Sequence, residues 1–323
     1  MTGADVVDVC AEMRAESRVA LAVHADPDLD AVGAAAGMLD LFAQLDADAA
    51  LYIDAGVVLP LSDVLLTTAE VRHGQPPAGA TLYALDSGSL ERLALTLDDR
   101  PARIVNIDHH HDNTRFGDLD LVCADASSTS QIVCDMAAGL GLRPSPAAAN
   151  ALYAGISFDS GHFRHDSTTA HTFECAAALV RCGAEPTRLY KLLYETRSLA
   201  SLRLWARALD NVMVAGAGRA LVAVLDRSDY EAAGAGDDET EGIVESLRSV
   251  VDVDVAVLVR RVARDGRVRA SLRSEGFDVS AVAALRGGGG HRQAAGFTTD
   301  GDPREVAAWL STELDARLST ASS

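Results

Sequence analysis

One short segment of the sequence combines a histidine with three aspartates. It reads His24-Ala-Asp-Pro-Asp28-Leu-Asp30, follows an apolar run and precedes a helical pattern. Carboxylates packed this closely repel one another, and a divalent cation removes the conflict. Asp28 or Asp30 could instead serve only as the N-cap of the helix. The density of anionic side chains favours a metal site with His24, Asp28 and Asp30 as ligands.

Similar side chains occur at three later positions. Asp86 ends an apolar run, Asp108 precedes three consecutive histidines that begin with His109 and His110, and Asp159 lies in Phe-Asp-Ser-Gly. An aspartate before consecutive histidines suggests a ligand imidazole held by a neighbouring carboxylate, with another imidazole free for proton transfer. Oxygen and nitrogen ligands without thiolate favour manganese, magnesium or zinc, and manganese suits a mixture of imidazole and carboxylate.

A second group of candidate residues lies near the C-terminus. Arg273 and Ser274 end a predicted strand, and four glycines at positions 287–290 precede His291. A glycine run lets backbone N–H groups approach a phosphate, although such runs are more often flexible loops. The nearby arginine and histidine add groups suited to binding a phosphate, which favours an anion site.

The segments around these residues predict alternating strands and helices. Residues 19–24, 82–86 and 104–108 have the pattern of buried strands, and residues 31–45 have that of a helix. Such alternation predicts a parallel sheet flanked by helices, in which ligands bind beyond the carboxyl ends of the strands. We therefore expect the polar strand ends to converge.

The second half predicts another, smaller α/β unit. Strands are expected at residues 219–225, 253–261 and 268–272, and helices at residues 240–250 and 303–318. The run 197–210 is predicted to be a connecting helix. We expect a catalytic domain at residues 1–195, a linker at 196–210 and a second domain at 211–323.

Composition narrows the classes of partner. The formal net charge of −19 argues against a long basic track for duplex nucleic acid. No apolar stretch is long enough for a membrane span, and the N-terminus lacks a secretion pattern, so we expect a cytoplasmic protein. The five cysteines form no C-x-x-C pair, which excludes a cysteine-rich zinc site and favours buried free thiols.

The ordered set of motifs resembles the DHH phosphoesterase superfamily, which has an H-x-x-x-D-x-D segment, an isolated aspartate, an Asp-His-His triplet and a later aspartate. The resemblance implies two divalent cations, Mn²⁺ or alternatively Mg²⁺ or Co²⁺, with Asp86 shared between them. It also implies that His110 faces the substrate and that Asp108 orients the triplet. The implied metal ligands are His24, Asp28, Asp30, Asp86, His109 and Asp159.

The C-terminal segments resemble the DHH-associated domain, in which an S-x-R-S strand and a G-G-G-H loop contact substrate across the interdomain cleft. The implied substrate-binding residues are Arg273, Ser274, Gly288, Gly289, Gly290 and His291. This pairing is similar to stand-alone nanoRNases and pAp phosphatases, which implies short oligonucleotides, pApA and 3′-phosphoadenosine 5′-phosphate (pAp) as substrates, and a homodimer. The alternatives are a phosphatase or pyrophosphatase for small phosphate esters and a cyclic-dinucleotide sensor without turnover.

Overall fold

The computed structural model describes residues 5–66 and 71–319. The chain divides into two compact units, residues 1–193 and 194–323. Each unit has its own sheet and its own hydrophobic core. The predicted class, an α/β protein of two domains, is confirmed.

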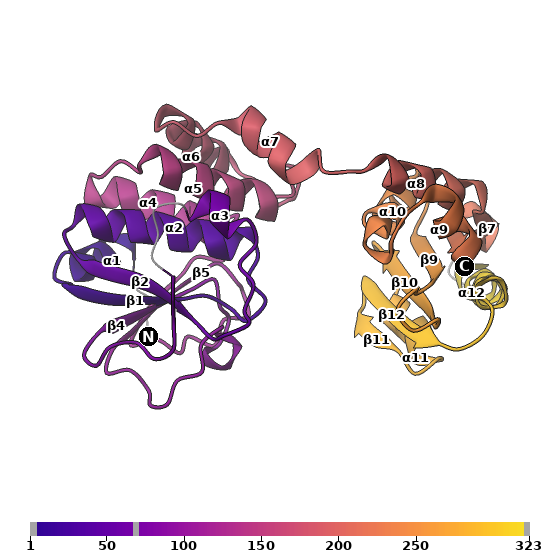
Figure 1. Cartoon of the computed structure of the whole chain (residues 1–323), viewed down its shortest axis with the longest axis horizontal. Coiled ribbons are helices and arrows are strands. Elements are labelled where there is room, and N and C mark those ends of the chain that lie inside the picture. Colours follow the sequence, from indigo (N-terminus) through magenta and orange to yellow (C-terminus); the bar gives the residue numbers. More distant parts are fainter. Residues whose placement is uncertain (1–4, 67–70, 320–323) are drawn as a thin grey trace. The chain divides into compact units, whose positions relative to one another are not determined.

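A parallel sheet of six strands forms the centre of the N-terminal unit (Figure 1). Its order is β3-β2-β1-β4-β5-β6, so the chain runs outward in one direction from β1 and in the other from β4. The topological switch point, where open parallel sheets bind ligands, therefore lies between the neighbouring strands β1 and β4. The strands are β1 (Arg18–Ala22), β2 (Asp48–Ile53), β3 (Val71–His73), β4 (Thr81–Leu85), β5 (Ile104–Asp108) and β6 (Leu119–Val122).

Alternating side chains of these strands enter two different cores. In β1 and its extension, Val19, Leu21 and Val23 face the main helical core, while Ala20 and Ala22 face a smaller core on the other side. Helices α2, α4 and α5 pack on one another over the first face (Figure 1). The helices of this unit are α1 (Val6–Met13), α2 (Leu29–Gln44), α3 (Ser62–Leu65), α4 (Thr129–Leu140), α5 (Pro146–Asp159), α6 (Ala170–Arg181) and α7 (Pro186–Tyr194), with the 3₁₀ turn η1 (Leu90–Arg92).

The C-terminal unit contains a mixed sheet in the order β11-β12-β10-β9-β8-β7. Only β8 and β9 are parallel, and the other neighbouring pairs are antiparallel. The strands are β7 (Met213–Ala215), β8 (Ala220–Leu225), β9 (Val255–Arg261), β10 (Val268–Ser274), β11 (Gly289–His291) and β12 (Ala294–Thr299). The helices are α8 (Leu199–Asp210), α9 (Arg227–Ala233), α10 (Ile243–Arg248), α11 (Val279–Ala284) and α12 (Pro303–Ser319), with the 3₁₀ turns η2 (Gly216–Gly218) and η3 (Asp237–Thr240).

Two segments have structural roles that the sequence analysis did not predict. Helix α8, expected as a connector, places Leu204 and Ala208 in a core shared with α9, α10 and the sheet of the C-terminal unit. Part of the glycine run forms β11, which pairs with β12. Among the described residues, no helix is long and apolar enough to cross a membrane.

Candidate metal centre

The six predicted metal ligands come together beyond the carboxyl ends of β1, β4 and β5. His24 follows β1, Asp86 follows β4, and His109 follows β5. Asp28 and Asp30 lie at the start of α2, while Asp159 is the last residue of α5. Residues far apart in the sequence therefore meet at the switch point of the sheet.

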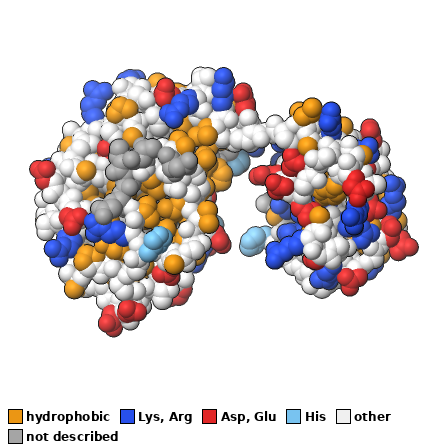
Figure 2. Space-filling view, viewed as in Figure 1, with side chains coloured by type: hydrophobic (Ala, Val, Ile, Leu, Met, Phe, Trp, Pro, Cys, Tyr) orange, Lys and Arg blue, Asp and Glu red, His pale blue; other side chains and the backbone are white. Residues whose placement is uncertain are grey.

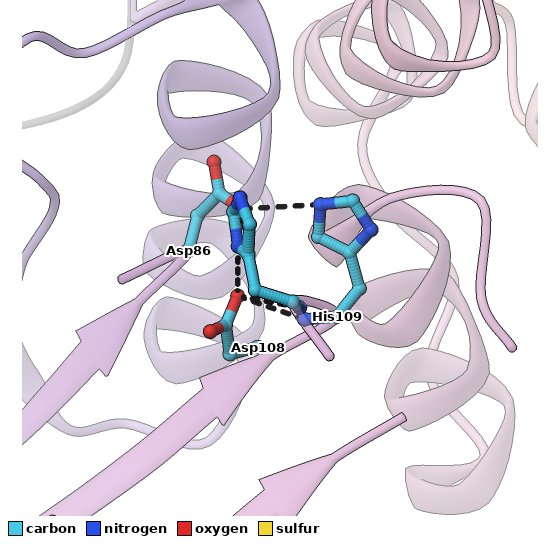
Figure 3. Close-up of side chains that lie close together, drawn as sticks. Asp86, Asp108 and His109 are labelled. Carbon is cyan, nitrogen blue, oxygen red and sulfur yellow. Dashed lines mark hydrogen bonds and ion pairs between the residues drawn. The ribbon is translucent and has the colours of Figure 1, made fainter. Parts of the chain in front are cut away.

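Asp86 lies at the centre of this group. Its Oδ2 is 3.6 Å from His24 Nε2. Its Oδ1 is 3.6 Å from His109 Nε2, as Figure 3 shows. The residue is only 2% exposed and has a φ of +56°, in the left-handed region that aspartate tolerates better than most non-glycine residues. This conformation ends β4 and lets one carboxylate face histidines from both neighbouring strands.

His24, Asp28 and Asp86 form the first potential ligand set, because their ligand atoms lie within 4.8 Å of one another. Asp28 Oδ1 also accepts hydrogen bonds from the N–H groups of Asp30 and Ala31, at 2.9 and 3.1 Å. Asp28 thus caps α2 and also faces His24. Although burial lowers it, contacts with Asp28 and Asp86 raise the pKa of His24 to about 9.

Asp30, His109 and Asp159 form the second set, within the same distance limit. His109 Nε2 is 3.1 Å from Asp159 Oδ2. Burial, together with repulsion from Asp86 and Asp28, raises the pKa of Asp159 to about 6. Burial and repulsion from Asp86 and Asp159 also raise the pKa of Asp30 well above its usual value.

The N-terminus of α4 holds the Asp30 carboxylate. Its Oδ2 accepts the N–H of Thr129 at 2.7 Å, and its Oδ1 accepts the N–H of Ser130 at 2.9 Å. Thr129 Oγ1 donates to Asp86 Oδ1 at 2.9 Å. Sequence reasoning missed both residues. The polar run at positions 127–131 before an apolar helix is a helix-start signal, but it does not indicate which carboxylates the helix would meet.

The donor set fits divalent cations. Asp30 and Asp86 are almost fully buried, and burial together with repulsion from Asp86 and Asp159 makes the ionised form of Asp30 costly without compensating charge. Two ions, each held by imidazole and carboxylate, would neutralise that charge. The absence of thiolates from both ligand sets suits manganese, magnesium or zinc.

In the Asp-His-His triplet, Asp108 holds the side chain of His110. Asp108 Oδ1 is 2.7 Å from His110 Nδ1, and Asn113 Nδ2 donates to Asp108 Oδ2 at 2.6 Å. The contact with Asp108 raises the pKa of His110. Asp108 is inaccessible to solvent, whereas the His110 side chain is about one-third exposed. The arrangement fixes the ring of His110 and leaves it accessible.

In the C-terminal unit, the sheet aligns two of the predicted substrate-binding residues. Arg273 on β10 and His291 on β11 both pair with Ala294 on the intervening strand β12. Directly opposed residues in antiparallel strands project from the same face, so arginine and histidine flank a small alanine. Their separation is two strand spacings, about 10 Å. Arg273 Nε also lies 3.2 Å from Glu245 Oε1.

The other predicted substrate-binding residues have distinct environments. Ser274 is buried, and its hydroxyl donates to the carbonyl of Phe277. A Cβ added at Gly288 would lie 2.2 Å from the Gly296 carbonyl oxygen, and one at Gly290 would lie 2.5 Å from that of Ala294. At Gly289 an added Cβ would meet nothing within 4 Å. Close packing against β12 explains why positions 288 and 290 are glycine, whereas a side chain at position 289 would have open space.

Comparison with known proteins agrees with this architecture. Residues 18–156 match the DHH family, N-terminal domain, and residues 217–319 match the DHHA1 domain. The chain is 33% identical over 292 residues to the bifunctional oligoribonuclease and PAP phosphatase NrnA of Thermus thermophilus, covering 88% of this chain and 85% of that protein. It is 28% identical over 276 residues to the NrnA of Bacillus subtilis, covering 84% of this chain and 86% of that protein.

A solved structure supports the fold. The crystal structure of an exopolyphosphatase-related protein from Bacteroides fragilis has a TM-score of 0.73 at 22% identity, covering 98% of this chain and 97% of that chain. The two matched domains and the Thermus relative show the family to which the chain belongs. The chain belongs to the DHH family of phosphoesterases and carries a C-terminal DHHA1 domain.

Proposed function

We propose that the chain hydrolyses short oligonucleotides and linear dinucleotides such as pApA to 5′-mononucleotides, and that it also dephosphorylates pAp. The observation that carries the proposal is the position of Asp86, within reach of His24 on one side and His109 on the other. One carboxylate shared by two ligand sets is the arrangement expected for two-metal hydrolysis of phosphoesters. The similarity to the two NrnA proteins supports this choice of substrates.

The proposed metal ligands divide into two sets that share Asp86, with Mn²⁺ as the expected ion. The first set adds His24 and Asp28, and the second adds Asp30, His109 and Asp159. When bound, two such cations supply the positive charge that activates water for in-line attack and stabilises the transferring phosphoryl group. Mg²⁺ and Co²⁺ are alternatives, because they accept the same donor atoms.

His110 is the proposed proton donor to the leaving oxygen. Its Nδ1 contacts Asp108, and this contact raises the pKa of His110, which favours the protonated ring that a proton donor needs. Asn113 holds the other oxygen of Asp108, so the ring has a fixed orientation. His110 can then give a proton from Nε2, while the buried carboxylate stabilises the charged ring.

The DHHA1 domain is the proposed binding site for the distal phosphate of the substrate. The guanidinium of Arg273 can form paired hydrogen bonds to phosphate, and His291 lies in register with it across Ala294. The open space at Gly289 leaves its backbone accessible to an anion. Arginine is interspersed with Asp and Glu on the face of this unit shown in Figure 2, an arrangement that suits a short substrate better than a duplex.

A substrate panel tests the proposal. Short RNA, pApA, cyclic di-AMP and pAp are each incubated with Mn²⁺, Mg²⁺ or Co²⁺, and the products are separated and identified. We expect mononucleotides from RNA and pApA, and loss of the 3′ phosphate from pAp. Asp86→Ala should abolish hydrolysis without unfolding the protein. Asp99→Ala is a matched control, because Asp99 is exposed and precedes β5 rather than following a strand end.

The same panel separates the alternatives. A phosphatase for small esters would consume pAp and leave pApA intact, and a pyrophosphatase would cleave pyrophosphate, which is added to the panel for this purpose. A sensor would bind a cyclic dinucleotide without forming product. Full activity of Asp86→Ala would contradict the shared-ligand assignment. The homodimer and the cytoplasmic location stay predictions from the sequence.

A further inference from the structure

A second group of potential metal ligands lies on α4 and α6, separate from the centre at the strand ends. Asp135 is on α4, and His171 and Cys175 are one helical turn apart on α6. His171 Nε2 is 2.8 Å from Asp135 Oδ1 and 3.6 Å from Cys175 Sγ, and Cys175 Sγ is 3.5 Å from Asp135 Oδ1. A carboxylate, an imidazole and a thiol thus converge, and none of them contributes to the proposed phosphoesterase mechanism.

These separations fit the edges of a tetrahedral zinc site. Zn–S bonds are about 2.3 Å, and Zn–N and Zn–O bonds are about 2.0 Å, so tetrahedral angles place sulfur about 3.5 Å from nitrogen and oxygen. Both distances from Cys175 Sγ agree with this value. Nitrogen and oxygen would lie about 3.3 Å apart around zinc. The observed 2.8 Å is a hydrogen bond, which an ion would open by about half an ångström.

Neighbouring side chains orient His171 and join the two helices that carry the three ligands. His171 Nδ1 lies 3.4 Å from Glu174 Oε2, so a carboxylate can orient the ring from the side opposite Nε2, as in many zinc sites. Thr172 lies between His171 and Cys175 in the sequence. Its Oγ1 donates to Gln131 Oε1 at 2.9 Å, which joins α6 to α4. The scaffold needs little rearrangement to bind an ion.

An ion can reach the group from solvent. Asp135, His171 and Cys175 all line a pocket of about 450 Å³, and half of the His171 side chain is exposed. The hydrogen bond with Cys134, together with burial, raises the pKa of the Cys175 thiol, so a bound ion must displace its proton. A thiolate favours zinc over manganese or magnesium, in contrast to the oxygen and nitrogen donors of the first centre.

We propose that Asp135, His171 and Cys175 bind one Zn²⁺, with water from the pocket as the fourth ligand. The ion would link α6 to α4, the helix whose first N–H groups hold Asp30. This site has no role in the phosphoester chemistry proposed above, so its test is independent of that function. The competing interpretation is an ordinary ion pair beside a buried thiol.

Cobalt absorption distinguishes these interpretations. The full-length protein is stripped of metal with a chelator, dialysed and titrated with Co²⁺. Thiolate bound to Co²⁺ gives a charge-transfer band in the near ultraviolet, which the thiolate-free phosphoesterase centre cannot produce. We expect a band that saturates at one thiolate-bound ion per chain and disappears when Zn²⁺ is added. Absence of the band would overturn the proposal.

Variants identify the thiol and the imidazole. Cys175→Ser should remove the band and lower the zinc content at dialysis equilibrium by one ion per chain. Cys182→Ser should retain both, because Cys182 lines the same pocket but lies outside the ligand group. His171→Ala replaces a half-exposed side chain and should weaken the band even if Cys175→Ser fails to fold. A band of full strength in Cys175→Ser or in His171→Ala would refute the assignment.

Discussion

Thr129 connects the two buried carboxylates of the candidate metal centre. Its N–H donates to Asp30, its hydroxyl donates to Asp86, and the residue is inaccessible to solvent. Thr129→Val keeps the shape of the side chain and the N–H, and removes only the hydroxyl donor. The substitution therefore tests whether the orientation of Asp86 matters to the metals that it is proposed to share.

The expected loss follows from the type of hydrogen bond. A hydrogen bond to a charged group contributes about 1.5–3 kcal/mol, and about 1.4 kcal/mol corresponds to a factor of ten in affinity. Partners that orient metal ligands typically account for about 10- to 100-fold in metal affinity or activity. We expect Thr129→Val to weaken Mn²⁺ binding by an amount in that range, because Asp86 would no longer be fixed toward both histidines.

Calorimetric titration of the metal-free protein with Mn²⁺ measures this loss. Thr129→Ser retains the hydroxyl and should bind nearly as tightly as the unmodified protein. Thr172→Val is the matched control, because it also removes the hydroxyl of a buried threonine. The Thr172 hydroxyl joins α6 to α4 and donates to Gln131, which is not a ligand of this centre. The control substitution should lower stability by about 1 kcal/mol and leave Mn²⁺ affinity unchanged. Equal affinity in Thr129→Val and the unmodified protein would refute the reasoning.

Three further outcomes are expected. Arg273→Ala should raise KM for pApA far more than it lowers kcat, with unchanged manganese content; a loss of bound manganese would mean that the role of Arg273 is misassigned. Adding Mn²⁺ at 100 times its Kd to the metal-free protein should stabilise the N-terminal unit by about 2.7 kcal/mol for each bound ion and raise its Tm by roughly 5–10 °C per ion, and an unchanged Tm would contradict the proposed ligands. Gly288→Ala should destabilise the C-terminal unit, because its Cβ would overlap β12, whereas Gly289→Ala should fold with an unchanged Tm; similar Tm values for the two variants would contradict the packing argument.

Hydrophobic patterning was sufficient to predict β1, β4 and β5, three neighbouring strands of the N-terminal sheet, but not β2. The predicted segments 82–86 and 104–108 correspond to β4 and β5 within one residue at each end, because both strands are uniformly buried and mostly apolar. Strand β11 was not predicted. It consists of Gly289, Gly290 and His291, whose side chains carry no strand pattern, and only its pairing with β12 forms it.

The candidate site shows a similar division. Residue types and strand ends were sufficient to predict which carboxylates and imidazoles converge, since parallel strands bring their carboxyl ends to one edge. The contacts from Thr129 and Ser130 were not predictable, because they depend on how α4 packs against the start of α2, about 100 residues earlier in the chain. The left-handed backbone of Asp86 also has no local signal. Both features arise from tertiary packing.

The glycine run illustrates how the structure refines a motif. The sequence alone gives Gly288, Gly289 and Gly290 the same predicted role in binding substrate. In the fold, Gly288 and Gly290 approach the backbone of β12 so closely that a Cβ would collide with carbonyl oxygens, which is sufficient reason for glycine at both positions. Gly289 has no such constraint, although it lies in the same strand as Gly290 and two residues before His291. If the run binds phosphate, the absence of a side chain at Gly289 is the feature that packing does not explain, and the anion should approach the backbone there.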